Sequence, residues 1–589
     1  MIRRIQRILP DAAGRSYAGS RLEPIVQWGV VLISLGLVLR SLIIIHDNFL
    51  VAQAFDQWNL VAAMATDFAS VFKPAYFFKH QNEHIIATSH AVFLLDYGLF
   101  DMRNILPITL IVVLDLVLAW LMTGIACGDM AKMWNRAFAA LAGVAMLSVA
   151  QWQNLLFGFQ VQFPLFLLFA ILAISACEQY AAARVFRRKL AIGLAAVLCI
   201  GLCTVSFGAG LFLGAPLLFV LFARRARIGD IVAVAVICVI FAALFLVDYH
   251  PNPYLAGRRS VVEVAFFFFA MLGSPFSPAI AVAAGIGATG LCVFMALLVD
   301  LVLLPYLRGE VVERRSVLLS AICLYMLCFA GFTAWGRVIV GLEYATLSRY
   351  ATPAFIFWIG IAGLLFRFVQ LRGPSDFLRR AALSLVSIAF LTGFGFSTLR
   401  PDANQTMKAA VAGVNEGAFF ALNDVSSERV LQTMFYLHAA RVVQSYPFLR
   451  EHRLSLFSPA AKWYVPPDFT GNPFEAPACP RWWIEQIENV APGGWAVRGW
   501  ALDPDGDANP EWILAFDRAG HRVGFTRSLL PRGELKAALH LKGEGFGFYL
   551  PIKLAEGQVP NGDLTLVAVD GKQPGRACRL AGAFVIPGK

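Results

Sequence analysis

Residues 105–124 read ILPITLIVVLDLVLAWLMTG, a stretch in which Asp115 is the single charged residue. A helix of about 20 apolar residues is long enough to cross the hydrocarbon core of a bilayer. The rest of the chain has the same character, because 58% of its 589 residues are hydrophobic and 15% are charged. Soluble proteins average about 45–50% apolar and about 25% charged residues. The sequence therefore predicts a polytopic α-helical membrane protein and excludes a soluble enzyme or a nucleic-acid-binding protein.

Hydropathy predicts about eleven transmembrane helices. They are expected at residues 25–45, 105–124, 137–151, 161–179, 191–206, 208–223, 229–248, 279–306, 316–334, 351–371 and 381–397. Basic residues recur at alternate connections, as they do in cytoplasmic loops, and they account for much of the net charge of +11. The N-terminal tail is one of these basic segments, so the N-terminus is expected inside. An odd number of spans then places the residues after about 397 outside.

The predicted domains are a basic cytoplasmic tail (1–24), a transmembrane domain (25–397) with a large outer loop (46–104), a helical linker region (398–480) and a β-sandwich (481–589). The sandwich is predicted from short apolar runs separated by turn residues such as Asp503-Pro-Asp-Gly506. The apolar run Val261–Gly273 does not fit the alternation of charges. It is expected to be an interfacial or re-entrant segment, and a twelfth span is the alternative.

The cysteines agree with this organisation. Eight of the ten fall in or beside predicted spans, whereas Cys479 and Cys578 flank the predicted sandwich. In an oxidising compartment these two are expected to form a disulfide, and two free thiols are the alternative.

The outer loop 46–104 carries the first group of candidate site residues. Asp56 and Trp58 lie in a segment with the pattern of an amphipathic helix, which turns its carboxylate away from its apolar face. Trp58 is expected to bind substrate. Asn82, Glu83 and His84 follow in the sequence His80-Gln-Asn-Glu-His84, and they are expected to bind substrate. The same five residues match the inverted zinc-peptidase motif H-x-x-E-H, which leaves metal binding by a helix as an alternative.

Other outer connections supply the second group. Gln153 and Gln160 lie between the third and fourth predicted spans and are expected to bind substrate, and Arg337, Arg349 and Tyr350 lie between the ninth and tenth. Arginines in an outer loop oppose the usual charge distribution, and a guanidinium binds phosphate oxygens in bidentate fashion. A lipid phosphate is the expected ligand, and an ion pair of Glu343 with either arginine is the alternative. Arg40, in the first span, is expected to join them or to extend toward the headgroups.

A carboxylate and arginines on one membrane face predict group transfer from a phosphate. The carboxylate would deprotonate an acceptor hydroxyl, which attacks a sugar carbon, while the lipid phosphate departs toward the arginines. No phosphate-binding Walker loop, dinucleotide fingerprint or G-x-S-x-G motif is present in the sequence.

A basic tail, one span and a long outer loop with an early acidic residue resemble the layout of the GT-C superfamily of membrane glycosyltransferases. The residues that carry the resemblance are Phe55-Asp-Gln-Trp58, Gln81-Asn-Glu-His84, and Arg337 with Ser348-Arg-Tyr350. The resemblance covers roughly residues 20–400. It implies a polyprenyl-phosphate sugar donor, with Asp56 in the place of the catalytic residue. Many relatives have a second acidic residue where this chain has Gln57, so a divalent cation (Mg or Mn) is left open as a cofactor.

The sequence therefore predicts an inverting glycosyltransferase of the bacterial inner membrane with its C-terminal domain in the periplasm. Its expected partners are a polyprenyl-phosphate-linked sugar donor, membrane lipids and an acceptor that is an envelope glycan, lipid or protein. A lipid-linked glycan transporter and an O-antigen-type polymerase or ligase are the alternatives. The aromatic residues of the sandwich (Trp482, Trp483, Trp495 and Trp512) are expected either to stack on sugars or to pack in its core.

Overall fold

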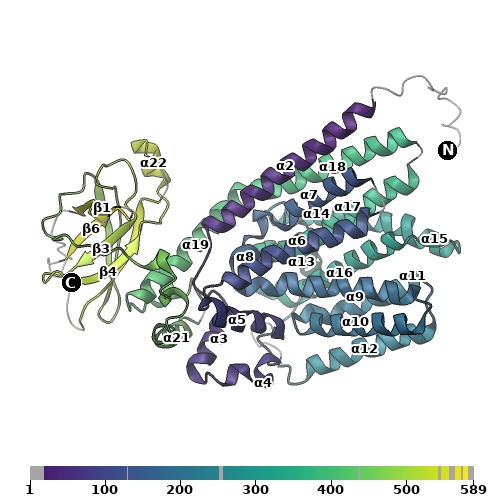
Figure 1. The fold of residues 1–589 in the computed structure, drawn as a ribbon, viewed down its shortest axis with the longest axis horizontal. Helices are drawn as coiled ribbons and strands as arrows, with labels where there is room; N and C mark the ends of the chain where they lie inside the picture. The colour runs from purple at the N-terminus through teal and green to yellow at the C-terminus, as the bar shows by residue number, and fades with distance from the viewer. Residues whose placement is uncertain are drawn as a thin grey trace.

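The structure is a computed structural model that describes residues 19–128, 131–250, 257–373, 375–435, 438–541, 545–555, 564–571, 573 and 575–580. A bundle of long helices makes up most of the molecule, and a β-sheet domain lies at one end of it (Figure 1). The N-terminal end of the first helix lies at the opposite end. The expected apolar helical bundle followed by a β domain is confirmed at this level.

Among the described residues, nine helices are long and apolar enough to cross a membrane. The helices of the bundle are α2 (Gly19–Asp47), α6 (Ile105–Cys127), α7 (Lys132–Met146), α9 (Gln162–Ala182), α10 (Phe186–Thr204), α11 (Gly214–Ala223), α12 (Ile228–Leu246), α13 (Val261–Gly273), α14 (Ile280–Leu298), α16 (Arg314–Arg337), α17 (Ala351–Arg372) and α18 (Asp376–Leu399). The predicted spans 191–206 and 208–223 coincide with α10 and α11 but are not among the nine. Helix α10 carries three basic residues in its first turn, and helix α11 has only 10 residues.

Short elements connect the bundle helices. In the outer loop these are α3 (Gln57–Thr66), η1 (Ser70–Phe72), α4 (Pro74–Phe77) and α5 (Ala87–Phe100). Further connections are η2 (Val149–Gln151), α8 (Trp152–Leu156), η3 (Gly158–Val161), η4 (Gly208–Leu213), the π-helix η6 (Val299–Leu303), α15 (Leu304–Leu307), η7 (Val338–Val340), η8 (Leu342–Thr346) and η9 (Ser348–Tyr350).

Helix α13 begins and ends at the end of the bundle that carries the β domain. Just before it, Arg259 Nε donates to the carbonyl of Trp335 near the last turn of α16. Just after it, Arg400, which follows α18, donates to the carbonyls of Ser274 and Pro275. A segment of 13 residues whose two ends meet the same end of the bundle has the geometry of a re-entrant helix. Whether α13 is interfacial, re-entrant or a twelfth span stays a prediction.

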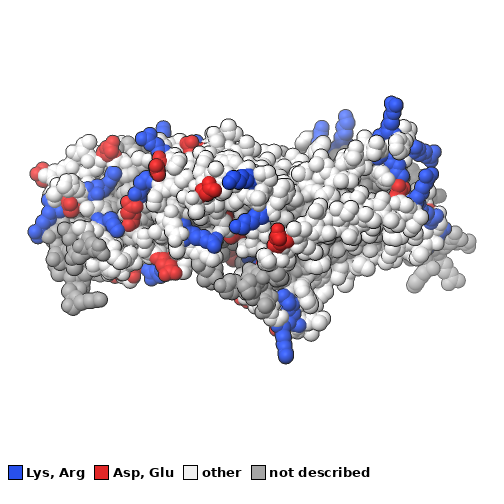
Figure 2. Space-filling model, turned by 90° about the horizontal axis from the view of Figure 1, so that it is seen from below, with Lys and Arg blue, Asp and Glu red and all other residues white. Residues whose placement is uncertain are grey.

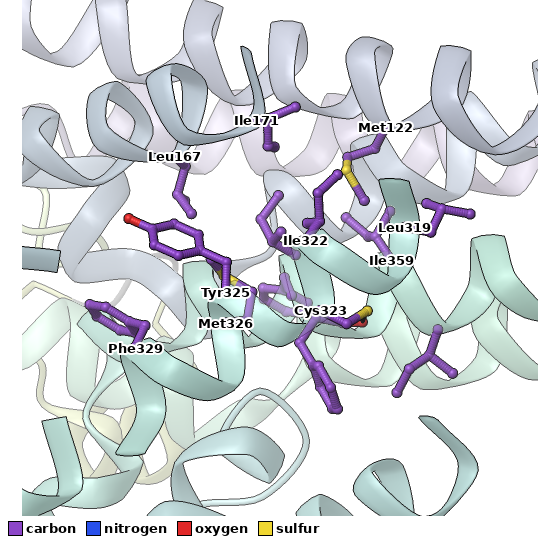
Figure 3. Packing of buried hydrophobic residues seen from close by; sticks show 14 of the residues in the cluster. Met122, Leu167, Ile171, Leu319, Ile322, Cys323, Tyr325, Met326, Phe329 and Ile359 are labelled. Atoms are coloured by element: carbon purple, nitrogen blue, oxygen red, sulfur yellow. Dashed lines mark hydrogen bonds between the residues drawn. The ribbon is translucent and has the colours of Figure 1, made fainter. Parts of the chain in front are cut away.

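The centre of the bundle is a continuous apolar core. Figure 3 shows Leu167 and Ile171 of α9 and Met122 of α6 facing Ile322 and Tyr325 of α16. The Tyr325 hydroxyl donates to the carbonyl of Ala209 at 3.2 Å, so even this polar atom is paired. Close packing of this kind fixes the positions of the helix ends, where the polar residues lie.

The predicted basic clusters meet at the end of the bundle remote from the β domain. In Figure 2, Lys and Arg gather at the right-hand end of the face shown, a belt with few charges follows, and mixed charges cover the left-hand part. Ion pairs within the protein hold several of these basic residues. They are Lys189–Asp230, Arg224–Glu178, Arg314–Glu178, Arg367–Glu313, Arg372–Asp300 and Arg380–Glu23.

Beyond the bundle, helices connect to a single antiparallel sheet. The helices are α19 (Pro401–Leu422), α20 (Glu428–Leu431), α21 (Ala439–Glu451), η10 (Ser455–Phe457) and η11 (Lys462–Tyr464). The strands are β1 (Trp482–Ala491), β2 (Gly494–Ala501), β3 (Trp512–Phe516), β4 (Arg522–Arg527), β5 (Gly547–Lys553), β6 (Thr565–Val569) and β7 (Ala577–Leu580), with α22 (Gly533–Leu539) between β4 and β5. Their order is β1-β2-β5-β4-β3-β6-β7.

The predicted β-sandwich is therefore wrong, because the seven strands form one sheet that curves into a half-barrel. Helix α19 covers the face of the sheet that carries Trp512, while the opposite face forms a separate core inside the curved sheet. Phe419 of α19 contacts Trp512 and Phe525 edge-on, and Trp512 is 3% exposed. Trp512 is thus a core residue, whereas Trp483 is 62% exposed. Strand periodicity in the sequence predicts a buried face but does not tell whether a sheet or a helix covers it.

A disulfide joins Cys479, before β1, to Cys578 in β7. The Cys479 N–H also donates to the carbonyl of Arg579 at 2.8 Å. The two ends of the half-barrel sheet are thereby tied together.

Candidate functional site

A cavity of about 510 Å³ is lined by the outer loop and by the ends of bundle helices. The outer-loop helices α3 and α5 lie at the end of the bundle that carries the β domain (Figure 1). Five groups of residues line the cavity: the outer loop, η3 with the start of α9, the turn and η4 helix after α10, the end of α12, and the segment from α16 to η9. Its polar lining residues are Asp56, Gln81, Asn82, Glu83, His84, Gln160, Gln162, Thr333, Arg337, Arg349 and Tyr350. The structure therefore brings Asp56, Asn82, Glu83, His84, Gln160, Arg337, Arg349 and Tyr350 together, all of which the sequence singled out.

Asp56 is positioned by the start of helix α3. The preceding residue, Phe55, has a φ of 55°, in the left-handed region that aromatic residues rarely adopt. Two contacts hold it there: its N–H donates to the carbonyl of Met434 at 2.9 Å, and its ring meets that of Phe157 edge-on. Local strain held by tertiary contacts is common at functional sites. The left-handed conformation of Phe55 directs the chain so that Asp56 lines the cavity.

The residues His80 to His84 form a tight turn. Gln81 N–H donates to His84 O at 2.8 Å, His84 N–H donates to Gln81 O at 3.1 Å, and Asn82 between them has a φ of 53°. The alternative in which this motif binds metal on a helix is therefore wrong, because the two histidines are not one helical turn apart. The turn instead presents Asn82 and Glu83 to the cavity, and Asn82 Nδ2 donates to Asp56 Oδ2 at 3.2 Å.

His84 lies against the wall of the cavity. Its ring stacks on Phe207 with 3.9 Å between the ring centroids. A Cβ at Gly208 would lie 2.8 Å from His84 Nδ1, so this close approach requires glycine. Burial, helped by the positive charge of Arg337, lowers the pKa of His84 to about 3. The imidazole is therefore neutral at physiological pH and is able to accept or donate one hydrogen bond, but not to carry charge.

The donor set does not fit a divalent cation. Among the described residues, no three His, Cys, Asp or Glu side chains come together in a way that could hold a metal. Gln57 stands where the resemblance implies a second acid, and it points into the protein, where its Nε2 donates to Asn104 Oδ1 at 2.7 Å. Two arginines in the same cavity would also repel a cation.

The two cavity arginines differ in their partners. Arg337 Nη2 lies 2.8 Å from Glu83 Oε2 and forms an ion pair with it. Arg349 stacks over the ring of Tyr350 at 5.4 Å, and within the described residues its guanidinium has no hydrogen bond or ion pair. In the same part of the chain, no ion pair joins Glu343 to either arginine, so the alternative with Glu343 is wrong. Arg349 is thus the cation available to a ligand.

The electrostatics of Asp56 reflect its surroundings. Burial raises the pKa of this carboxyl above its ordinary value, and the nearby charge of Glu83 adds to the effect. The positive charges of Arg349, His438 and Arg337 act in the opposite direction. A carboxylate with a raised pKa is a stronger base than a solvent-exposed one, which suits it to accept a proton.

Arg349 is held through its backbone. Its N–H donates to Gln153 Oε1 at 3.2 Å, and its carbonyl accepts from Asn154 Nδ2 at 2.7 Å. Ser348 Oγ also accepts from the Gln153 N–H at 3.1 Å. Gln153, predicted to bind substrate, does not line the cavity. It belongs to a clamp that orients Arg349.

Two further predicted residues lie away from the cavity. Trp58 is fully buried, and its indole N–H donates to Gln53 O at 3.1 Å, because its side of α3 packs against α21. Arg40 donates to the carbonyl of Thr398 at 3.0 Å, between α2 and α18. Neither residue is part of the cavity lining, so neither takes the binding role predicted there, and the extension of Arg40 toward the headgroups stays a prediction.

The sequence analysis missed the aromatic wall of the cavity. The wall consists of Phe159, Phe163, Phe207, Phe212, Phe245, Tyr249, Phe329, Phe332 and Trp335. Phe332 and Trp335 are more than half exposed on the outside of α16, so the wall continues onto the apolar surface of the bundle. In a chain with 49 phenylalanines, composition alone does not separate these rings from core residues.

Comparison with known proteins adds no assignment: no protein-family model matches the chain, and no curated protein matches its sequence.

Proposed function

We propose that the protein is a membrane glycosyltransferase that moves a sugar from a polyprenyl-phosphate carrier to an acceptor hydroxyl with inversion at the anomeric carbon. The observation that carries this proposal is one cavity that holds both a carboxylate of raised pKa, Asp56, and a guanidinium with no hydrogen bond or ion pair to any described residue, Arg349. The proposal includes eleven spans, an inner-membrane location, an inside N-terminus and a periplasmic β domain. The acceptor is an envelope glycan, lipid or protein.

In the proposed reaction, Asp56 takes the proton of the acceptor hydroxyl as its oxygen attacks the anomeric carbon. The bond between that carbon and the carrier phosphate breaks, and the phosphate leaves with the electron pair and a second negative charge. Arg349 stabilises this charge as it develops. Stabilisation of developing charge by a fixed group is usually the largest single contribution to catalysis. Asn82, His84 and Gln160 offer hydrogen bonds to sugar hydroxyls.

The apolar side of the cavity suits the carrier lipid. Phe332 and Trp335 belong both to the cavity wall and to the lipid-facing surface of α16. A prenyl chain would contact this surface while its phosphate remains beside Arg349. A water-soluble nucleotide sugar has no apolar chain that would contact this wall.

The test is turnover in proteoliposomes supplied with polyprenyl-phosphate sugars and an envelope extract. The Asp56→Asn variant is expected to lose about 10²–10⁴-fold in turnover, the contribution of a general base, while it still binds the carrier lipid. Equal turnover in both proteins would remove Asp56 from the chemistry. Movement of the lipid between leaflets without sugar release would overturn the transferase in favour of a transporter.

A further inference from the structure

A hydrogen-bonded chain leads from helix α21 to the Asp56 carboxylate. Arg441 Nη1 donates to Asn59 Oδ1, and Asn59 Nδ2 lies 3.4 Å from Asp56 Oδ1. Asn82 Nδ2 donates to the other carboxylate oxygen at 3.2 Å. Both oxygens of Asp56 therefore face amide N–H groups, one of which depends on a residue 382 positions away in the sequence.

Arg441 decides which way the Asn59 amide points. A guanidinium only donates hydrogen bonds, so it must face the oxygen of the Asn59 amide. The amide nitrogen then necessarily faces Asp56. Without Arg441, the amide is free to rotate and to place its oxygen beside the carboxylate, which would oppose the charged form of Asp56.

We propose that Arg441 is a positioning residue that keeps Asp56 in its basic, ionised form through Asn59. Hydrogen bonds to a carboxylate favour its ionised form and so counteract the rise in pKa that burial causes. This inference rests on the proposed role of Asp56 as the base. It also means that the region 398–480, expected to be a linker, completes the site.

Other charged groups around Asp56 must be separated from this effect. Arg349 and Arg337 lie across the cavity, Glu83 lies on the turn, and His438 precedes α21. All act on Asp56 through their charge. Arg441 differs from them because it makes a hydrogen bond to the residue that contacts Asp56.

The experiment compares Arg441→Leu with Arg450→Leu. Arg450 lies on the same helix, is also exposed, and pairs with Asp424 rather than with α3. Two quantities are measured: the pH dependence of kcat/KM, and the infrared band of the protonated Asp56 carboxyl group, which is assigned by its absence in Asp56→Asn. Thermal melting checks that each variant folds.

In Arg441→Leu, the midpoint of the Asp56 titration and of the acid limb of kcat/KM is expected to rise by about one pH unit, the effect of losing one hydrogen bond to the charged form. Arg450→Leu is expected to keep the wild-type midpoint. Arg441→Lys, which still only donates, is expected to restore it. Asn59→Leu is expected to give the same shift alone and combined with Arg441→Leu, because both act on one path.

An unchanged midpoint in Arg441→Leu would overturn the proposal. An equal shift in Arg441→Leu and Arg450→Leu would also overturn it, since overall charge would then explain the effect. The infrared titration does not require turnover. If wild-type protein transfers no sugar while Arg441→Leu still shifts the Asp56 band, then the positioning by Arg441 stands and the proposed function fails.

Discussion

Both ends of the helical bundle contain carboxylates beside arginines, but the two ends satisfy these charges differently. At the end remote from the β domain, Glu178 is 1% exposed in its side chain, and Arg314 and Arg224 approach its two oxygens at 2.5 Å and 3.3 Å. In the cavity, Asp56 is bound by two amides, and Arg349 has no hydrogen bond or ion pair among the described residues.

The charges around Glu178 stabilise the fold, whereas Asp56 and Arg349 are able to interact with a ligand. Removing a charge from water costs several kcal/mol unless a partner compensates it. At Glu178 the protein supplies that partner itself. In the cavity, the half-buried guanidinium of Arg349 feels the charge of Asp56 but has no hydrogen bond or ion pair among the described residues, so it is able to bind an anion. The predictions below test this contrast through turnover, from the largest expected effect to the smallest.

Among the variants that test this contrast, the largest effect is expected for Arg349→Gln. Loss of the unpaired cation removes the stabilisation of the departing phosphate, so kcat/KM is expected to fall about 10²–10³-fold. Arg349→Lys is expected to recover only part of this loss, because an ammonium group lacks the planar bidentate geometry. Steady-state kinetics in proteoliposomes measure both. Arg372→Gln, which breaks a pair with Asp300 at the other end, is the control and is expected to stay within about twofold. An equal loss of kcat/KM in Arg372→Gln would show that the two ends of the bundle do not differ in this way.

A smaller effect is expected for Asn154→Ala. This change removes the hydrogen bond to the Arg349 carbonyl, so the guanidinium is less well oriented, and kcat is expected to fall about tenfold with the cavity otherwise intact. Asn423→Ala is the matched control, since Asn423 holds the backbone of Phe525 in the same manner in the β domain. Wild-type kcat in Asn154→Ala would show that Arg349 needs no clamp.

Glu178→Gln tests the paired charges at the end of the bundle remote from the β domain. Replacing the carboxylate leaves Arg314 and Arg224 without their counter-charge, and because their side chains are 54% and 22% exposed, water replaces part of it and the cost is expected to be about 1 kcal/mol. The melting temperature in detergent is expected to fall, while turnover at 25 °C is expected to remain within about twofold of wild type. A large loss of turnover in a folded variant would mean that the two ends of the bundle are coupled.

The residues of the cavity were predictable from sequence because charge is rare in this chain. Asp56, Glu83, Arg337 and Arg349 are conspicuous among apolar residues, and the alternation of basic loops places them on one face. Their roles depend on tertiary contacts that no local pattern contains. The choice of Glu83 over Glu343 as the partner of Arg337 is one such contact.

Other errors have the same origin. A five-residue motif with two histidines is compatible with a helix, but Asn82 adopts a left-handed conformation that closes a turn instead. Trp58 carries an N–H that suits a ligand, yet the backbone of Gln53 accepts it in the core. Arg441 was not predicted because it lies in a segment with the composition of a soluble protein, where arginines are common.

The smallest effect on turnover is expected for Cys479→Ser with Cys578→Ser. The disulfide closes a loop of 99 residues, and loops of about that length lose about 4–5 kcal/mol of stability when opened. The β domain is therefore expected to unfold at a lower temperature. Arg429 binds both Glu488 and Tyr549 and keeps the sheet attached to α20 independently of the disulfide. Because Arg441 and Asn59 belong to helices outside the sheet, turnover below the new melting temperature is expected to equal that of wild type. A loss of turnover at a temperature where the sheet is folded would show that the site depends on the β domain as well as on α21.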